Sequence, residues 1–298
     1  MHAPPDLSTR VALVAGASRG VGRGVALALG EAGATVYVTG RTLKSARRRD
    51  VAGSVDETAS DVSRAGGRGL AVQADHTRVE DVRALVARIE AESGGLDLLV
   101  NAVWGGNEVP MSGGPFWDEP LAHWDATTRS GVWAALLTTR FAAPALRDGA
   151  LVATVTFRDQ GRYTGHLYDD LAKASLSRLA LGMAEDLKPR GVTSVAVSPG
   201  LVRTERVLAA HGVTERTWRR APALAGSESP RYVGRAVAAL AADPARLTRT
   251  GQTLLAADLA REYGVTDLDG TQPAPFRLPG QGARGTGQEG AGGVVQGA

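Results

Sequence analysis

A glycine-rich loop near the N-terminus joins an apolar, strand-like run (residues 11–15) to an amphipathic, helical one (residues 21–32). Its three glycines have the spacing G-x-x-x-G-x-G, which lets the backbone turn sharply and bring its N–H groups against a pyrophosphate. The same spacing seats the following helix close to the sheet. We therefore predict a dinucleotide-binding loop made of Gly16, Ser18, Arg19, Gly20, Val21 and Gly22.

Strand-like and helical runs alternate along the rest of the chain. The predicted strands are residues 11–15, 35–39, 69–73, 96–101, 150–156, 193–198 and 252–255, and the predicted helices include residues 21–32, 79–93, 121–146, 170–188 and 230–242. Such alternation is typical of an α/β fold, in which helices cover both faces of a mostly parallel sheet. We predict a doubly wound, Rossmann-type sheet of about seven strands in one domain, residues 1–278, followed by a disordered Gly-rich tail, residues 279–298.

Composition excludes several classes of protein. The 298 residues include no cysteine, and the five histidines do not pair at ligand spacing, so we expect neither a disulfide framework nor a metal site. The isoelectric point is near 9.5, but the net charge is only +3 and the basic residues are scattered, which argues against nucleic-acid binding. No run is apolar enough for a membrane span or a signal peptide. We expect a soluble, cytoplasmic protein that binds a small-molecule substrate.

The residues that end each strand carry most of the functional information, because ligands bind beyond the carboxyl ends of parallel strands. After the second strand stand Arg41 and Thr42, where an NAD-selective protein usually has an acidic residue for the ribose hydroxyls. Arg41, together with Arg19, can instead pair with a 2′-phosphate, so we expect NADP(H). The third strand ends at Asp75, whose carboxylate can accept a hydrogen bond from adenine, and at His76, which we expect to pack or cap beside the cofactor site.

These motifs resemble those of the short-chain dehydrogenase/reductase family over about residues 8–258. The glycine loop resembles the family's T-G-x-x-x-G-x-G, and the run that ends in Asn101 resembles the stretch leading into its N-N-A-G. Residues 198–204 resemble its P-G-x-x-x-T. The resemblance implies that Asp75 contacts adenine, that Asn101 borders the cofactor, and that Pro199, Gly200 and Thr204 lie at the nicotinamide. Within the family, residues 101–106 and 259–264 resemble the branch of dehydrogenase/reductase member 1 and its bacterial relatives.

The family's catalytic residues are Asn, Ser, Tyr and Lys, with the last two arranged as Y-x-x-x-K on one helix. The lysine lowers the pKa of the tyrosine, which then exchanges a proton with the substrate oxygen. Here Lys173 is present and is implied to orient the nicotinamide ribose, but Asp169 stands in the tyrosine position. Tyr168 lies five residues before Lys173, about 140° away on a regular helix. It is the predicted general acid only if a bulge or a late helix start turns it inward.

Three further positions complete this interpretation. Asp169, with a reference pKa of about 3.9, is a poor proton donor but a reasonable base or ion-pair partner for Lys173. Thr156 replaces the family's serine and keeps a hydroxyl that can polarise a carbonyl oxygen. Gly131 replaces the asparagine that holds a water relay behind the lysine.

We therefore expect an NADP(H)-dependent oxidoreductase that acts on a carbonyl or an alcohol, with residues 204–229 as a substrate lid and residues 104–116 over the nicotinamide. Two alternatives stay open. One is a redox-inactive member of the family that binds a nucleotide and a partner. The other is a non-redox enzyme, such as a dehydratase or isomerase, that uses Asp169 with Lys173. The resemblance also implies a homo-oligomer formed through residues 121–146 and 170–188.

Overall fold

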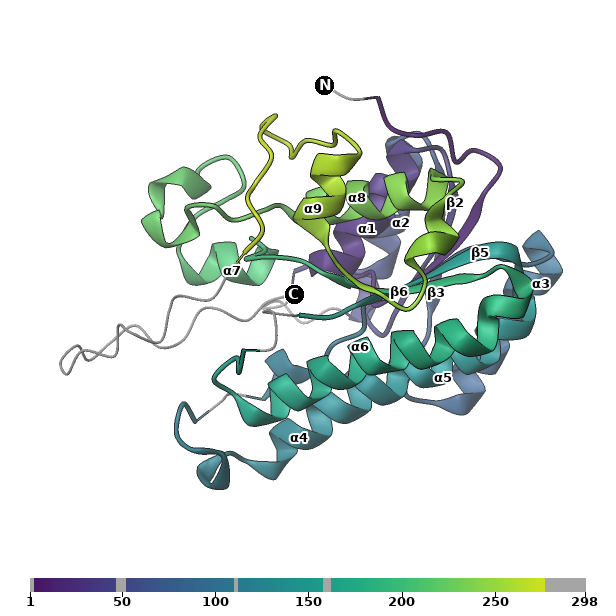
Figure 1. The fold of residues 1–298 in the computed structure, drawn as a ribbon. Helices are drawn as coiled ribbons and strands as arrows, with labels where there is room; N and C mark the ends of the chain where they lie inside the picture. Colours follow the sequence, from purple (N-terminus) through teal and green to yellow (C-terminus); the bar gives the residue numbers. More distant parts are fainter. Residues whose placement is uncertain (1–2, 47–51, 110–111, 158–161, 277–298) are drawn as a thin grey trace.

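The computed structural model describes residues 3–46, 52–109, 112–157 and 162–276, which form one seven-stranded parallel sheet (Figure 1). Its order is β3-β2-β1-β4-β5-β6-β7, as predicted for a doubly wound sheet. The strands are β1 (Val11–Ala15), β2 (Thr35–Gly40), β3 (Arg68–Gln73), β4 (Leu96–Asn101), β5 (Leu146–Val155), β6 (Thr193–Ser198) and β7 (Thr253–Leu255). Because the strand order reverses between β1 and β4, the sheet is open to a ligand beyond the carboxyl ends of these two strands.

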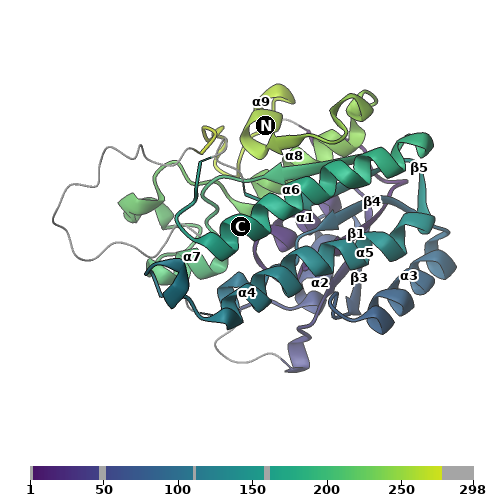
Figure 2. The same cartoon turned by 60° about the horizontal axis from the view of Figure 1, so that its bottom comes forward.

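Helices cover both faces of the sheet (Figure 1). One face carries α1 (Gly20–Glu31), α2 (Val55–Arg64), α8 (Pro230–Ala242) and α9 (Ala256–Glu262). The other carries α3 (Val79–Ser93), α4 (Leu121–Thr127), α5 (Ala134–Ala142) and α6 (Leu167–Leu187), with α5 and α6 side by side (Figure 2). In β1, Ala12 and Val14 pack toward the first group, whereas Leu13 packs toward the second. A strand that is buried on both sides needs apolar residues at every position, which explains the continuous apolar run.

The predicted helix 121–146 is helical from Leu121 to Ala145, but it is not one regular α-helix. It is divided into α4, a π-helical segment (Thr128–Trp133) and α5, and it ends in a short 3₁₀ turn, Ala143–Ala145. Pro144 lies in that turn and has no N–H to continue the helical hydrogen bonds. As a result β5 begins at Leu146, four residues before the predicted start.

Helix α6 begins at Leu167, before the predicted start at residue 170, and it is α-helical from there to Leu187. The short helices α7 (Glu205–Ala210) and α9 are absent from the predicted set, because two turns or fewer give little periodicity. The ten-residue α2 is also absent from that set. The predicted tail, residues 279–298, lies outside the described residues. No helix in the described part of the chain has both the length and the apolar composition needed to span a membrane.

Candidate functional site

A cavity of about 560 Å³ lies beyond the carboxyl ends of the strands around β1. It brings together most of the residues that the sequence assigned to a nucleotide, namely Gly16, Ser18, Arg19, Gly20, Val21, Gly22, Arg41, Thr42, Asp75, His76, Lys173 and Thr204. Segments up to 188 positions apart in the chain therefore share one wall. Asn101, Pro199 and Gly200 stand at strand ends but are not in the lining of this cavity.

The glycine loop has the geometry that its spacing predicts. Gly16 has φ +82°, and a Cβ on it would lie 2.7 Å from the carbonyl oxygen of Ala102 at the end of β4. A side chain at this position would therefore be strained and would collide with β4. At the start of α1, the backbone N–H of Gly20 donates to the Glu205 carboxylate at 2.9 Å. An anionic group already lies at the helix N-terminus, where the partial positive charge of the helix favours it.

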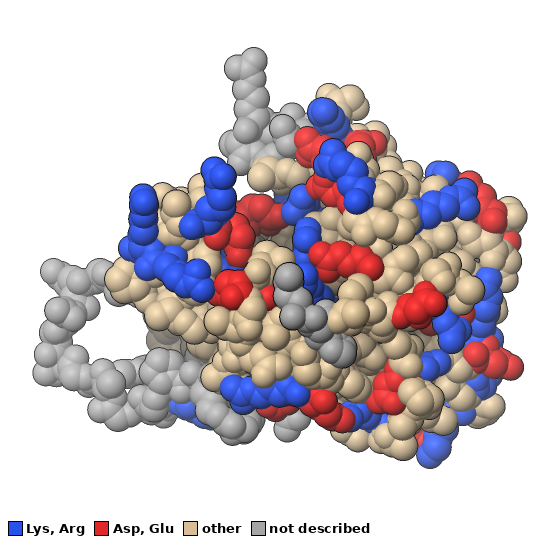
Figure 3. Space-filling view, turned by 90° about the horizontal axis from the view of Figure 1, so that it is seen from above, with Lys and Arg blue, Asp and Glu red and all other residues tan. Residues whose placement is uncertain are grey.

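Two arginines border the cavity beside this loop. Arg41 forms an ion pair with Glu108, and Arg19 donates to the Thr42 hydroxyl at 3.1 Å. The Arg19 Nε is buried and has no hydrogen-bond partner among the described residues. On the face shown in Figure 3, basic and acidic side chains are interspersed. The two cavity arginines can therefore bind an anionic ligand once the ion pair between Arg41 and Glu108 breaks.

Asp75 and His76 have different environments at the end of β3. The Asp75 carboxylate accepts hydrogen bonds from the Thr77 N–H and hydroxyl at 2.9 Å and 2.7 Å. The His76 ring is buried between the hydroxyls of Thr39 and Thr138, at 2.7 Å and 2.9 Å. Burial lowers the pKa of His76 to about 4, so the ring is neutral at physiological pH. These contacts agree with the expectation that His76 packs beside the site.

Lys173 reaches the cavity from α6 and lies against an aromatic ring. Its side chain is buried, and its Nζ lies 3.6 Å from the centroid of the Trp104 indole. Such a cation–π contact stabilises a desolvated ammonium group. Burial lowers the pKa of Lys173 to about 8, and the charge of Asp169 opposes this shift. The ammonium group is therefore a much stronger acid than that of an exposed lysine.

Trp104 also explains the missing asparagine at position 131. A Cβ on Gly131 would lie 2.8 Å from Cζ3 of the Trp104 indole, closer than carbon atoms approach. The indole thus occupies the space that a side chain at position 131 would need. The sequence predicts that residues 104–116 lie over the site, but it does not predict this packing. The sequence features related to this contact are the tryptophan at position 104 and the glycine within the predicted helix at position 131.

Tyr168 and Asp169 point in different directions at the start of α6. The Tyr168 hydroxyl donates to the Phe116 carbonyl at 3.3 Å, and its ring packs against His123 and Trp124. Asp169 is buried, and its Oδ1 lies 3.0 Å from Nε2 of His123. Because α6 is regular from Leu167, the bulge or late start that would turn Tyr168 toward Lys173 is absent. His123 was not among the site residues predicted from the sequence.

Thr156 lies at the end of β5 and is fully buried. Its hydroxyl donates to the backbone carbonyl of Lys173 at 2.7 Å, and the neighbouring Val155 lines the cavity. Asn101, at the end of β4, donates to the Thr139 hydroxyl at 2.9 Å. In this structure both side chains tie a strand end to the helix behind it.

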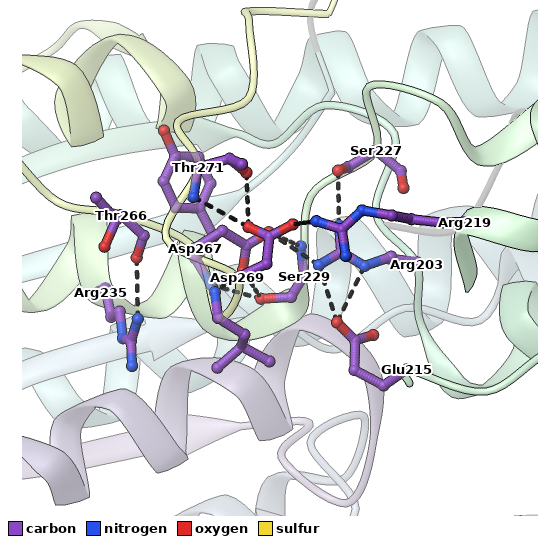
Figure 4. Close-up of polar contacts among 12 residues, drawn as sticks. Arg203, Glu215, Arg219, Ser227, Ser229, Arg235, Thr266, Asp267, Asp269 and Thr271 are labelled. Carbon is purple, nitrogen blue, oxygen red and sulfur yellow. Dashed lines mark hydrogen bonds and ion pairs between the residues drawn. The ribbon is translucent and has the colours of Figure 1, made fainter. Parts of the chain in front are cut away.

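The segment that follows β6 is anchored by hydrogen bonds and ion pairs of the buried Arg203 (Figure 4). Arg203, 1% exposed, donates to Glu215 and to Asp267 at 2.8 Å and 3.0 Å, and also to the Ser227 carbonyl. Beside this cluster, the buried Glu228 carboxyl accepts the N–H of Gly200 at 2.9 Å. The turn at residues 199–200 and the predicted lid are therefore both anchored by buried polar contacts in this region.

Comparison with known proteins agrees with this geometry. A family model described as Enoyl-(Acyl carrier protein) reductase matches residues 16–257. The mouse protein Dehydrogenase/reductase SDR family member 1 is 35% identical over 272 residues, which cover 88% of this chain and 84% of that protein. A short chain dehydrogenase from Mycobacterium thermoresistibile has a TM-score of 0.76 at 25% identity, over 91% of this chain and 94% of that one. Another, from Burkholderia cenocepacia J2315 in complex with NADP, has a TM-score of 0.64 at 26% identity, over 83% and 96%. The chain therefore belongs to the short-chain dehydrogenase/reductase family.

Proposed function

We propose that this protein is an NADP(H)-dependent oxidoreductase that acts on a small carbonyl or alcohol substrate. The observation that carries the proposal is the single cavity that joins the glycine loop, Arg41 and Lys173. The buried Nε of Arg19, which lacks a partner among the described residues, is a donor suited to a phosphate oxygen. The complex of the Burkholderia relative with NADP supports the same cofactor class.

The bound cofactor would supply hydride transfer, and the chain's own residues would bind and orient its parts. The N–H groups at the start of α1 would hold the pyrophosphate, Arg41 and Arg19 the 2′-phosphate, and Asp75 the adenine amine. Lys173 would orient the nicotinamide ribose. Thr204 and the turn at Pro199 and Gly200 would contact the nicotinamide carboxamide, as the family resemblance implies.

The two hydroxyls predicted to act on the substrate oxygen, those of Tyr168 and Thr156, are hydrogen-bonded elsewhere in this structure. For Tyr168 to serve as the general acid, its hydroxyl must leave the Phe116 carbonyl and the side chain must rotate toward Lys173. Likewise Thr156 must release the Lys173 carbonyl before it can polarise a substrate oxygen. A Tyr168→Phe variant that retains full carbonyl reduction would exclude the tyrosine from proton transfer.

The cofactor preference is tested by equilibrium binding of NADPH and NADH to the whole protein. Replacing Arg41 with Ala should weaken NADPH binding about 10-fold or more and leave NADH binding nearly unchanged, because only NADPH carries the 2′-phosphate. The matched control is Arg178→Ala, which removes an exposed arginine on α6. Equal losses for the two nucleotides would contradict the assignment of Arg41 to the 2′-phosphate.

A non-redox or redox-inactive role is the second candidate, and it is favoured by Asp169 in the tyrosine position and by the Trp104 indole over Gly131. The discriminating measurement is transfer of deuterium from labelled NADPH into a panel of aldehydes and ketones. Incorporation into any product supports the oxidoreductase. NADPH binding without transfer, combined with water loss or isomerisation of hydroxy or unsaturated acyl compounds, would support the alternative.

We further propose a homo-oligomer formed through α4, α5 and α6, which lie together on one side of the molecule (Figure 2). Large apolar side chains are exposed on these helices and on the π-helical segment: Leu121, Trp124, Trp133, Leu136 and Leu171. Large apolar side chains exposed on neighbouring helices are candidates for a protein interface. Light scattering at several concentrations measures the assembly, and a Leu136→Glu variant should dissociate it.

A further inference from the structure

His123 lies in a buried position where both of its ring nitrogens face oxygen atoms. Its Nε2 is 3.0 Å from Oδ1 of Asp169, and its Nδ1 is 3.3 Å from the carbonyl oxygen of Val109. The side chains of His123 and Asp169 are 2% and 8% exposed. The contact with Asp169 is therefore buried, whereas the contact with the Val109 carbonyl is partly buried.

These contacts favour one additional proton on the pair. The Val109 carbonyl can only accept, so Nδ1 must carry a proton to bond with it. At the other contact, either Nε2 or the Asp169 carboxyl must carry a second proton, because a bare carboxylate and a bare ring nitrogen would both be acceptors. In each case the pair holds one proton more than a neutral imidazole beside an ionised carboxylate. A pair with no net charge is also cheaper to bury than a lone carboxylate.

The pair lies next to the ionisable group that borders the cavity. Asp169 stands one helical turn before Lys173, and the two charges interact. Among the described residues, two further ionisable groups interact with His123. They are Tyr168, whose ring packs on it, and Glu119, whose carboxylate is held by Ser112 and lies within electrostatic range. Asp169 is thus the link between His123 and the cavity.

We propose that His123 and Asp169 form the proton reserve of this site and resupply Lys173 with the proton that it gives to the substrate oxygen. The proposal rests on the proposed function, because it requires a reaction in the cavity that consumes a proton. When hydride reaches a carbonyl carbon, the C=O electron pair moves to oxygen, an N–H bond of the Lys173 ammonium breaks, and an O–H bond forms. The neutral Lys173 amine then takes the additional proton from the pair of His123 and Asp169. Solvent finally protonates the pair again. Lys173 is the catalytic residue in this scheme, whereas Asp169 and His123 act through it.

Lys173 is suited to such a role. An acid works best when its pKa lies near the operating pH, and the buried ammonium is closer to that range than an exposed lysine. The arrangement also removes the need for a tyrosine four residues before the lysine, the position that Asp169 occupies.

The direct test is NMR spectroscopy of the whole wild-type protein labelled with ¹⁵N-histidine and ¹³C-aspartate. The chain has five histidines, and loss of one signal set in His123→Gln assigns the ring. At pH 7 we expect two protonated ring nitrogens with an ionised Asp169, because the electrostatic link to Lys173 requires the Asp169 charge. A neutral His123 ring beside an ionised Asp169 would overturn the proposal. The protonation states are measured on the wild type without a substrate, and the variant serves only to assign the signal.

The link to Lys173 is tested by titrating the lysine amines, of which the sequence has three, in Asp169→Asn and in the matched control Asp170→Asn. Removing the Asp169 charge should shift the Lys173 titration to lower pH by about one pH unit, and the control should leave it in place. With a carbonyl that the wild type reduces, Asp169→Asn should lower kcat about 10-fold or more, with little change in KM and an altered pH profile. An unshifted Lys173 titration would overturn the link.

NADPH binding distinguishes a failure of the proton reserve from a failure of the proposed function. If the wild type binds NADPH and transfers hydride but the NMR result is negative, the proton reserve is wrong and the proposed function stands. If the NMR result is positive but NADPH does not bind, the proposed function fails and the proton reserve fails with it, because no hydride acceptor then consumes its proton.

Discussion

The Trp104 indole contacts both the Lys173 ammonium and the backbone of the π-helical segment at Gly131. Replacing Gly131 with Ala puts a methyl group into the edge of the indole and should destabilise the protein by about 1–3 kcal/mol. Gly182 on α6 is the matched control, because no atom lies within 4 Å of a Cβ built there. Gly182→Ala should be neutral or stabilising by up to about 1 kcal/mol. Urea unfolding measures both, and equal effects would contradict the packing argument.

A second prediction concerns the ionisation of the buried Glu228 carboxyl and its effect on stability. Burial raises the pKa of Glu228 from 4.5 to about 7, against the opposing hydrogen bond from Gly200. Between these values the folded protein holds a proton that the unfolded chain has released, so this group's contribution to stability is full below about pH 4.5 and falls as the pH rises toward 7. The shift corresponds to about 3 kcal/mol.

Glu228→Gln should therefore raise the melting temperature at pH 8 by several degrees relative to wild type and change it little at pH 5. The Gln side-chain oxygen can still accept the Gly200 N–H. Thermal unfolding at the two pH values decides the matter, and a gain that is independent of pH would point to packing instead of ionisation.

At the scale of elements, α7 places the Glu205 carboxylate on the N–H of Gly20 at the start of α1, and Arg23 lies 3.7 Å from the same carboxylate group. An incoming phosphate would compete with this anion for the helix N-terminus. Glu205→Gln should strengthen NADPH binding about 3-fold to 10-fold, because the amide keeps the hydrogen bond but not the charge. Glu185→Gln, at an exposed site on α6, is the control. Unchanged or weaker binding would show that Glu205 does not compete.

At the scale of the whole molecule, Arg203 joins the predicted lid to the segment that follows α9 (Figure 4). Arg203→Met would leave the buried Asp267 without its cation and should cost about 3–5 kcal/mol of folding free energy. Arg219, whose ion pair with Asp269 is at the surface, is the control, and Arg219→Ala should cost less than about 1 kcal/mol. Chemical denaturation compares the two, and cleavage by a protease within residues 204–229 should increase only for Arg203→Met. Similar costs for both variants would refute a special role for the buried cation.

The sequence by itself determined the parallel α/β sheet, the glycine loop and the strand-end residues, because these depend on local periodicity and on glycine spacing. Strands 11–15, 96–101 and 193–198 and helices 79–93 and 230–242 have the predicted bounds. Parallel topology then brings the strand ends together without further information. Arg41 and Asp75 could therefore be assigned to one site from the sequence, whereas Lys173, which lies within a helix, was implied only by the resemblance to the family.

Only the tertiary structure decided how the side chains around Lys173 are arranged. The regular start of α6 at Leu167 directs Tyr168 to Phe116 and Asp169 to His123, which lies 46 positions away in the sequence. The Trp104 indole reaches Lys173 from a different strand end. Neither the phase of a helix relative to its neighbours nor a contact between distant residues is encoded in a local pattern, because both depend on how the assembled elements pack.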